Sequence, residues 1–398
     1  MELSITDFGF DGEGVGKVDQ KVCFVRFALV GERVEVEPCQ THAKFLKAKL
    51  VNVTKPSNRR VVPPCPYFAR CGGCDFQHIS YQDELAIKKQ ILQRQLQKLG
   101  QNPSITVQAS GQEYHYRNKV KLFASNGLAF HSAYGQGFVK IDKCLIAKPQ
   151  INKTIAHLSK FLEREKLFEK IKYVEIKQIE KTILINLFVR KTIAAGFQNF
   201  ISTLGCRAKI FQTEGKKTSL LASSDCFEAS SPNSFHQVND QMADLLYQKV
   251  CSLAKGKTIA NCYSGAGLLS KMLLDCGGKK VYGLELGQSE HQEAENLKKR
   301  YRLASLQNIQ GDCAQTLPSI KNQVELIIVD PPRAGCSQKV LASIDESAAC
   351  ELVYISCNHA SFARDVGRLK NFVLDQVEIF DMFPKTANFE IFSHLHRI

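Results

Sequence analysis

Four cysteines form the first group of side chains whose types and spacing could do chemistry. Cys65, Cys71 and Cys74 follow the pattern C-x5-C-x2-C in PPCPYFARCGGC, and Cys144 lies much later, in VKIDKCLIAK. Four thiolates with no nearby histidine suit either a tetrahedral zinc ion or an iron–sulfur cluster. The two glycines before Cys74 indicate backbone that bends tightly around a bound group. The alternative, small buried thiols, fits the other cysteines better.

A further cysteine, Cys357, has a pattern typical of a nucleophile. It ends VYISC, which we expect to be a buried strand, and a helix, ASFARDVGRLK, follows. A helix N-terminus lowers the pKa of a nearby thiol, so we expect Cys357 to favour the thiolate. A buried inert thiol is the alternative reading, and it suits Cys350 or Cys251 better.

Three segments of the same half could form a cofactor pocket. In NCYSGAG, Gly265 and Gly267 allow backbone to approach a ligand closely, but the third glycine of a dinucleotide fingerprint is absent. Glu285, which ends KVYGLEL, stands where a ribose diol would be held, and Asp312 could accept an adenine amino group. Each acid alone could be a solvated loop carboxylate. In this order and spacing they indicate an S-adenosylmethionine site.

Asp330 begins the segment DPPRAG at the end of another expected strand. The two prolines fix φ and hold this carboxylate rigidly, which suits a site that grips a planar nitrogen base beside a methyl donor. An amino-methyltransferase could use the same segment. That chemistry has no use for Cys357 or for Glu390 near the C-terminus.

The elements that must position these residues alternate between helix and strand from about residue 239. KTIANCY, KVYGLEL, VELIIVD and ELVYISC read as buried strands, and DQMADLLYQKVCSLA, GLLSKMLLDCG and SEHQEAENLKKRY read as helices. Such alternation predicts parallel strands with crossover helices, a doubly wound α/β sheet. Ligands bind beyond the carboxyl ends of such strands, where these side chains are expected.

The first half of the chain is predicted to be mostly β. Strands LSITDF, KVCFVRFALV, ERVEVEP and FLKAKLVNV are broken by a glycine-rich turn, FGFDGEGVGK, and a second strand-rich region covers about 105–231. Between them, YQDELAIKKQILQRQLQKLG predicts a helix with an apolar stripe and a basic outer face. The stripe comprises Leu85, Ile91, Leu92, Leu96 and Leu99, and the outer face mostly Lys88, Lys89, Arg94 and Lys98.

Length and charge indicate a multi-domain protein with a polyanionic partner. The 398 residues suffice for two or three domains, and 53 basic against 39 acidic residues give a net charge of +14. Such an excess favours nucleic acid, although a solvated basic surface is the plainer alternative. No export signal or membrane-spanning run is apparent, so we expect a cytoplasmic protein whose cysteines are reduced thiols or ligands.

Together these segments resemble the iron–sulfur RNA (uracil-C5)-methyltransferases along the whole chain. FGFDGEGVGKVDQKVCFVRFALVGERVEVE is similar to the family's TRAM domain, and CPYFARCGGCDFQHISY to its cluster motif. EYHYRNKVKL, SPNSFHQVN, DPPRAG, YISCN, FARD and DMFPKTANFE match further signatures. The TRAM-like segment makes the chain most similar to the 23S ribosomal RNA members, because the bacterial transfer-RNA branch usually lacks one.

The resemblance implies three domains. These are a small TRAM-like, OB-like β-barrel (1–57), a central iron–sulfur domain (58–79 and 110–231) and a Rossmann-like methyltransferase domain (80–109 and 232–398). It implies a nucleophile, Cys357, a general base, Glu390, and a [4Fe-4S] cluster on the four cysteines. The implied cofactor residues are Gln237, Tyr263, Gly265, Glu285, Asp312 and Asp330. Four positions depart from the family's usual residues: Asn261, Ser264, Leu268 and His359.

The expected reaction is S-adenosylmethionine-dependent methylation of a uridine flipped out of 23S ribosomal RNA, by a monomer. Uracil C5 is a weak nucleophile, and addition of a thiolate at C6 activates it; a base must then remove the C5 proton. A transfer-RNA substrate stays open. So does a non-catalytic RNA-binding descendant of the family, for which Asn261 and Leu268 are the only support. A TRAM-containing radical enzyme would need an open iron site and no Rossmann-like half.

Overall fold

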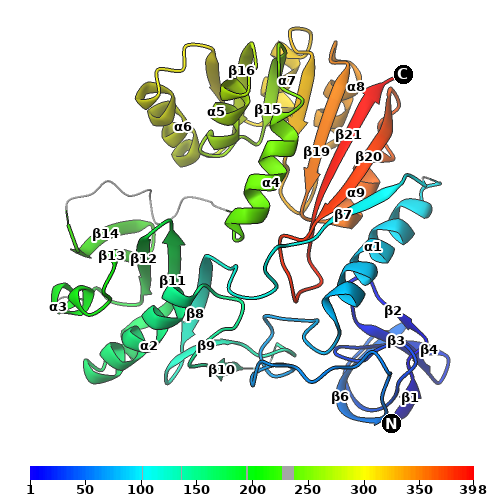
Figure 1. Cartoon of the computed structure of the whole chain (residues 1–398), viewed down its shortest axis with the longest axis vertical. Helices are drawn as coiled ribbons and strands as arrows, with labels where there is room; N and C mark the ends of the chain where they lie inside the picture. Colours follow the sequence, from blue (N-terminus) through cyan, green and yellow to red (C-terminus); the bar gives the residue numbers. More distant parts are fainter. Residues whose placement is uncertain (101, 136, 194–195, 226–236) are drawn as a thin grey trace. The chain divides into compact units, whose positions relative to one another are not determined.

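The computed structural model describes residues 1–100, 102–135, 137–193, 196–225 and 237–398, and its contacts divide the chain into two compact units (Figure 1). The first unit comprises Met1–Glu84, Gly111–Asn233 and Phe383–Ala387. The second comprises Leu85–Ser110, Ser234–Met382 and Asn388–Ile398. Across these ranges, no helix combines the length and apolar character needed to cross a membrane.

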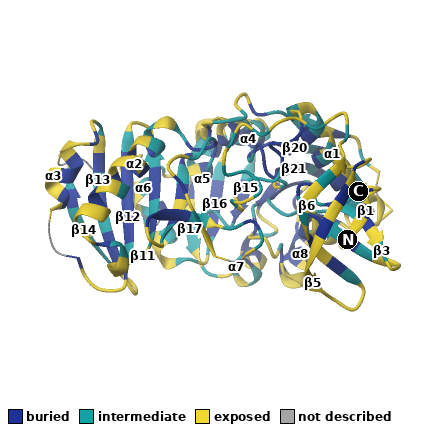
Figure 2. Ribbon diagram, turned by 90° about the horizontal axis from the view of Figure 1, so that it is seen from below, coloured by how far each residue is buried: buried dark blue, intermediate teal, exposed yellow. Residues whose placement is uncertain are grey.

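The N-terminal part of the first unit is a six-stranded sheet in the order β1-β5-β6-β4-β3-β2. Its strands are β1 (Glu2–Ser4), β2 (Asp7–Phe8), β3 (Gly14–Val18), β4 (Lys21–Val25), β5 (Arg33–Thr41) and β6 (Phe45–Lys55). Leu3, Val25 and Val34 belong to its small apolar core. Buried residues alternate with more exposed ones in the first part of β5 and of β6, visible as yellow and blue bands in Figure 2. This alternation is the pattern of a sheet with one solvated face.

The expected glycine-rich turn at FGFDGEGVGK is only partly a turn, because its second half forms strand β3. A Cβ atom on Gly14 would lie 2.7 Å from the carbonyl oxygen of Ala28, and one on Gly16 would lie 2.5 Å from the carbonyl oxygen of Ser4. These glycines therefore allow close backbone approach inside the sheet rather than a bend. The predicted turn is confirmed for residues 9–13, between β2 and β3, and was wrong only for the second half of the segment.

A second sheet of the first unit has seven strands in the order β10-β9-β8-β11-β12-β13-β14. The strands are β8 (Lys119–Ala124), β9 (Leu128–His131), β10 (Phe138–Lys140), β11 (Ile171–Ile179), β12 (Thr182–Val189), β13 (Arg207–Glu214) and β14 (Lys217–Ser223). Helices α2 (Pro149–Arg164) and α3 (Phe197–Ser202) lie along it, with a short 3-10 turn at Phe168–Lys170 (Figure 1). Leu158 and Phe200 of these helices share one core with Val174 and Ile185 of the strands. The strand-rich prediction for this region is confirmed.

The second unit is built on an eight-stranded sheet in the order β17-β16-β15-β18-β19-β21-β20-β7. The strands are β7 (Ile105–Gln108), β15 (Thr258–Cys262), β16 (Lys280–Glu285), β17 (Leu306–Gln310), β18 (Leu326–Val329), β19 (Glu351–Ser356), β20 (Phe372–Phe380) and β21 (Glu390–Arg397). The first five in this order are parallel, and β21 is antiparallel to both β19 and β20.

Crossover helices connect these strands, as the alternating pattern predicts. They are α4 (Asp240–Cys251), α5 (Leu268–Asp275), α6 (Gln288–Arg300), α7 (Cys313–Ile320), α8 (Gln338–Asp345) and α9 (His359–Val366). The chain runs outward from β15 to β17 on one side and from β18 to β19 on the other. The strand order therefore reverses between β15 and β18, where open α/β sheets bind ligands. The doubly wound sheet is confirmed.

Helix α1 (Tyr81–Gln97) corrects two expectations about its faces. Lys88, expected on the outer face, is fully buried, since it shares the spacing of Leu85 and Leu92. Its Nζ donates to the Asp381 Oδ1 atom at 2.6 Å, and both side chains are 0% exposed. Leu99, expected on the apolar stripe, lies beyond the helix end and is 46% exposed.

The buried Lys88–Asp381 pair gives a test of the second unit's stability. Lys88→Met leaves a buried carboxylate without its cation, which typically costs about 3–5 kcal/mol. We expect faster hydrogen exchange at the amides of α1 and β20, and recovery of most of this loss in the double variant Lys88→Met/Asp381→Leu. Lys89→Met, at an exposed neighbour on the same helix, is the control and should leave exchange unchanged.

Candidate active site

The carboxyl-terminal edge of the parallel sheet carries most of the residues singled out in the sequence. Tyr263 follows β15, Glu285 ends β16, Asp330 follows β18 and Cys357 follows β19. Glu390 reaches the same edge differently. It begins β21, which runs antiparallel to β19 with Ser356 opposite Ile391, so the start of β21 lies beside the end of β19. The sheet thus brings Cys357 and Glu390 together from distant parts of the chain.

The thiol of Cys357 is half-buried, and its pKa is raised rather than lowered. Burial is the main cause, and the charges of Glu390 and Asp330 add to it, whereas Arg333 opposes them. The helix N-terminus does not outweigh these contributions, and Asn358 caps α9. The Oδ1 atom of Asn358 accepts from the N–H groups of Ala360 and Ser361. The expectation of a lowered thiol pKa was therefore wrong for this state of the protein.

Two carboxyl groups lie near this thiol. Glu390 is 4% exposed, and its pKa is raised well above the ordinary value by burial and by the charge of Asp330, with Arg333 opposing. Burial raises the pKa of Asp330 to about 6. Like charges held this close in a protein interior resist simultaneous ionisation. Both carboxyl groups of this pair therefore bind protons more tightly than exposed carboxyl groups do.

Two residues around this centre, Arg333 and Tyr247, were missed in the sequence. Arg333 is the nearby cation, and its guanidinium donates to the Oδ1 atom of Asn388 at 2.9 Å. Burial raises the pKa of Tyr247, and the charges of Asp330 and Glu390 add to it, while a hydrogen bond involving Gln237 lowers it. Arg333 lies inside DPPRAG and could have been recognised as part of the motif. Tyr247 lies within α4 and has no local signal.

A buried carboxylate, Asp365, fixes the loop that carries Asp330 and Arg333. Its Oδ2 atom accepts from the backbone N–H of Cys336 and the hydroxyl of Tyr354, each at 2.7 Å, and Asp365 is 0% exposed. A side chain on Gly335 would collide with it, since a Cβ there would lie 2.3 Å from the same oxygen. The segments DPPRAG and FARD therefore interlock, which explains the glycine.

The glycine turn after β15 has the geometry of a ligand loop. Tyr263 and Gly265 both have positive φ, at 61° and 54°, and a Cβ added at Gly265 would meet nothing within 4 Å. The N–H of Gly265 donates to one carboxylate oxygen of Glu285 at 2.8 Å, and the N–H of Gly287 donates to the other at 2.6 Å. Glu285 is thus held against the loop, and its remaining lone pairs can still accept hydroxyl groups.

The other residues of this region have mixed surroundings. Asp312 is exposed and caps α7, accepting from the N–H of Ala314 at 2.8 Å. Asn261 is buried and donates to the hydroxyl of Ser270, whereas Leu268 is 51% exposed at the start of α5. The Oγ atom of Ser264 is buried with no hydrogen-bond partner within the described residues. An orphaned hydroxyl beside an open glycine turn is compatible with a polar ligand.

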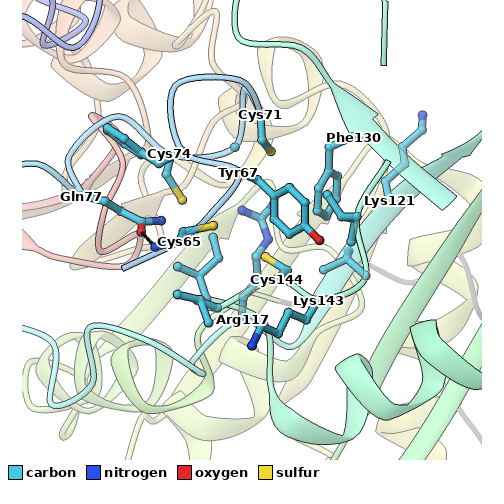
Figure 3. Close-up of a pocket in the computed structure, with 16 residues that line it drawn as sticks. Cys65, Tyr67, Cys71, Cys74, Gln77, Arg117, Lys121, Phe130, Lys143 and Cys144 are labelled. Atoms are coloured by element: carbon cyan, nitrogen blue, oxygen red, sulfur yellow. Dashed lines mark hydrogen bonds between the residues drawn. The ribbon is translucent and has the colours of Figure 1, made fainter. Parts of the chain in front are cut away.

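The first unit contains a separate candidate site, a pocket of about 170 Å³ lined by Cys65, Cys71, Cys74 and Cys144 (Figure 3). Tyr67 and Arg117 also line it. In Figure 3 the four sulfur atoms surround the same space, although Cys144 is remote in sequence. Where the structure describes the chain, no three histidine, cysteine or carboxylate side chains converge closely enough to hold a single ion.

Three thiols of this pocket, those of Cys71, Cys74 and Cys144, have raised pKa values. Burial raises the pKa of Cys71 to about 11, with the charges of Cys144 and Cys65 adding to it. Burial also raises the pKa of Cys74, well above its ordinary value, and that of Cys144. Four mutually repelling thiolates suit a site in which positive metal centres compensate the charge.

The N-terminal residues and the C-terminal quarter match known protein families. Residues 1–51 match the TRAM domain, and residues 290–398 match the tRNA (uracil-5-)-methyltransferase family.

Of the SPNSFHQVN segment, only Gln237, Val238 and Asn239 lie within the described residues, and Cys226 lies outside them.

Whole-chain relatives agree with these matches. An uncharacterized RNA methyltransferase of Caldanaerobacter subterraneus subsp. tengcongensis is 31% identical over 100% of this chain and 98% of its own length. One from Clostridium tetani is 28% identical over 98% and 94%. The crystal structure of Pyrococcus abyssi tRNA (uracil-54, C5)-methyltransferase in complex with S-adenosyl-L-homocysteine aligns with a TM-score of 0.80 at 23% identity, over 99% of this chain and 100% of its own. The chain belongs to the RNA (uracil-5-)-methyltransferase family and is an RNA-methylating enzyme.

Proposed function

We propose that the enzyme methylates C5 of one uridine in 23S ribosomal RNA through a covalent bond between Cys357 and C6. The observation that carries the proposal is the meeting of Cys357, Glu390 and Asp330 at one sheet edge. An amino-methyltransferase would need the DPPR carboxylate alone. A nucleophilic thiol with a buried carboxyl group beside it suits a reaction that adds to a base and later removes a proton.

The proposed methyl donor is S-adenosylmethionine, and the glycine turn fits it. Gly265 leaves open space, Glu285 presents a fixed carboxylate and Ser264 offers an unused hydroxyl. The residues that would hold the donor are Gln237, Tyr263, Gly265, Glu285, Asp312 and Asp330. When bound, it supplies an electrophilic methyl group for C5 of the uracil.

The protein's own part of the reaction has two stages. First, the Cys357 thiol releases its proton to solvent and the sulfur bonds to C6, so that the C5=C6 electron pair moves onto C5 and the C4 carbonyl. Arg333 favours this thiolate. After C5 has been alkylated, Glu390 takes the C5 proton, the C5=C6 bond re-forms and the C6–S bond breaks. Burial raises the pKa of Glu390, which makes it a stronger base for this step than an exposed glutamate.

The cysteine pocket fits a [4Fe-4S] cluster better than zinc. A zinc ion draws four sulfurs to about 2.3 Å from one point, whereas these four cysteines are among the residues that line a larger cavity of about 170 Å³. The proposed ligands are Cys65, Cys71, Cys74 and Cys144. Bound there, the cluster would tie the loop before α1 to the segment after β10, a structural role that compensates the repulsion among the thiolates.

Transfer RNA is the second candidate substrate, because the Pyrococcus abyssi protein, which aligns over its whole length, is described as acting on it. The TRAM match favours ribosomal RNA by the resemblance described above. Mapping 5-methyluridine in both RNA classes of a deletion strain decides between them. Loss of the mark from a single 23S position supports the proposal, and loss from transfer RNA overturns its ribosomal part.

The first prediction from this proposed function concerns metal content. Protein purified without oxygen should be brown and hold about four irons per chain. Cys144→Ser should lose colour and iron, whereas Cys206→Ser, a half-buried cysteine outside the pocket, should keep both. One zinc and no iron per wild-type chain would contradict the assignment.

The second prediction separates the two stages of the reaction. Glu390→Gln keeps the side chain's shape but removes the base, so proton removal should slow by about 10²–10⁴-fold. A methylated protein–RNA adduct should then accumulate on ordinary RNA and survive a denaturing gel. Cys357→Ala should form no adduct even with 5-fluorouridine RNA, from which the wild type cannot be released, and the exposed Cys350→Ala serves as control. Normal turnover by Glu390→Gln would place the base elsewhere, with Asp330 examined next.

The third prediction uses the raised pKa of Glu390. A carboxyl group whose pKa is higher in the folded state binds protons more tightly there, so folding stability falls as pH rises from about 4.5 toward the folded value. Glu390→Gln should therefore be more stable than the wild type at pH 8, by roughly 1.4 kcal/mol per unit of pKa shift, and the gain should vanish near pH 4.5.

Glu351→Gln is the matched control, with the opposite sign. Burial raises the pKa of Glu351, but hydrogen bonds from Lys257 and His394 outweigh it, and the net pKa is lowered. This variant should be less stable than the wild type at pH 8, with the loss shrinking as pH falls through the folded pKa. Parallel pH profiles for the two variants, measured by urea unfolding, would contradict the electrostatic account.

A further inference from the structure

Five strands of the seven-stranded sheet each contribute one ring to a continuous aromatic row. The row comprises Phe188 of β12, Tyr173 of β11, Phe123 of β8, His131 of β9 and Phe138 of β10. The strands are neighbours in that order, and Tyr173 is opposite both Phe188 and Phe123, as Phe138 is opposite His131. The row therefore crosses the sheet nearly at right angles to the strands.

The rings of this row contact one another. Tyr173 and Phe188 stack with centroids 4.1 Å apart, and Phe123 lies 6.0 Å from Tyr173. Phe123 is 4.2 Å from His131 and 5.1 Å from Phe138, and His131 stacks on Phe138 at 5.0 Å.

The aromatic row lies on the face of the sheet opposite its core. The residues that alternate with the rings, Leu122, Val174 and Leu187, are 0% exposed and belong to the core under α2 and α3. Phe130, next to His131, packs against this core, whereas none of the five rings is among the residues that do so. Phe138 is 46% exposed. Cross-strand pairing stabilises a sheet, but it does not require an exposed ring on the edge strand β10.

A cation accompanies the row. The Nζ atom of exposed Lys121 lies 3.8 Å from the ring centroid of Tyr173 and 5.5 Å from that of Phe123. Lys119, two residues earlier on β8, pairs with Glu175 at 2.8 Å, so the acid on this face is already neutralised. The chain as a whole carries a net charge of +14. The surface therefore combines flat apolar rings with available positive charge.

We propose that the aromatic row binds an unpaired stretch of the substrate RNA, with bases stacked on the rings and a phosphate near Lys121. This inference rests on the proposed function only in taking RNA as the substrate. Bases of single strands expose their faces to aromatic side chains, whereas a duplex hides them. Rings spread over five strands offer room for more than one base, and Lys121 supplies the charge complementarity.

The test measures fluorescence anisotropy of a labelled 12-nucleotide oligouridine and of a duplex of equal length with the full-length protein. Phe123→Leu and Tyr173→Leu keep apolar bulk in the sheet but remove the rings. Each should weaken single-strand binding by roughly tenfold, since stacking contributes ~1–3 kcal/mol per base, and leave duplex binding unchanged. Phe138→Ala should weaken single-strand binding in the same way. Because Phe138 is exposed on the edge strand β10, this variant should not disturb the packing of the sheet.

Phe211→Leu is the matched control, because Phe211 is half-buried on β13 of the same sheet but outside the row. Unchanged single-strand binding in the row variants overturns the proposal. An equal loss for single strand and duplex also overturns it, since that result indicates charge rather than stacking. Because the assay follows RNA binding and not methylation, a failure of the methylation chemistry stays distinct from a failure of the aromatic row.

Discussion

The antiparallel pairing of β21 with β19 is the constraint on which the candidate site depends. Parallel strands can bring only their carboxyl ends to the ligand-binding edge, and Cys357 and Asp330 reach it in this way. Glu390 starts its strand, so only an antiparallel partner in the register of Ser356 with Ile391 can place it there. The antiparallel strand β21 thus places Glu390 at the same sheet edge as Cys357, which follows β19.

Much of the second unit could be predicted from the sequence because its buried strands are short apolar runs between helices of clear period. Polar residues at the ends of those runs had to meet at one edge, which anticipated Cys357 and Asp330. The remaining features depend on contacts between distant segments. Lys88 can be buried because its ammonium group pairs with Asp381. Strand β3 contains glycines because the backbone of other segments lies close to it. Neither contact can be recognised from the local sequence.

The electrostatics of the site show the same limit more sharply. The sequence predicts a helix N-terminus after Cys357, which would lower the thiol pKa. In the folded protein Asn358 caps that helix, and the charges of Glu390 and Asp330 raise the pKa instead. Burial of Glu390 and Asp330 together is unfavourable for folding, as function-bearing sites often are. Asp365 accepts three hydrogen bonds from surrounding groups and so stabilises the loop that carries Asp330. This stabilisation offsets part of the repulsion between Asp330 and Glu390.

The raised pKa of Cys357 has a consequence for the enzyme between catalytic cycles. Oxidants and alkylating metabolites react with thiolates and spare neutral thiols. Because burial and the charges of Glu390 and Asp330 raise the pKa of Cys357, this thiol should form sulfenic acid and react with adventitious electrophiles more slowly than an ordinary cysteine. The two carboxyl groups of the candidate site therefore also bear on the chemical durability of this thiol between turnovers.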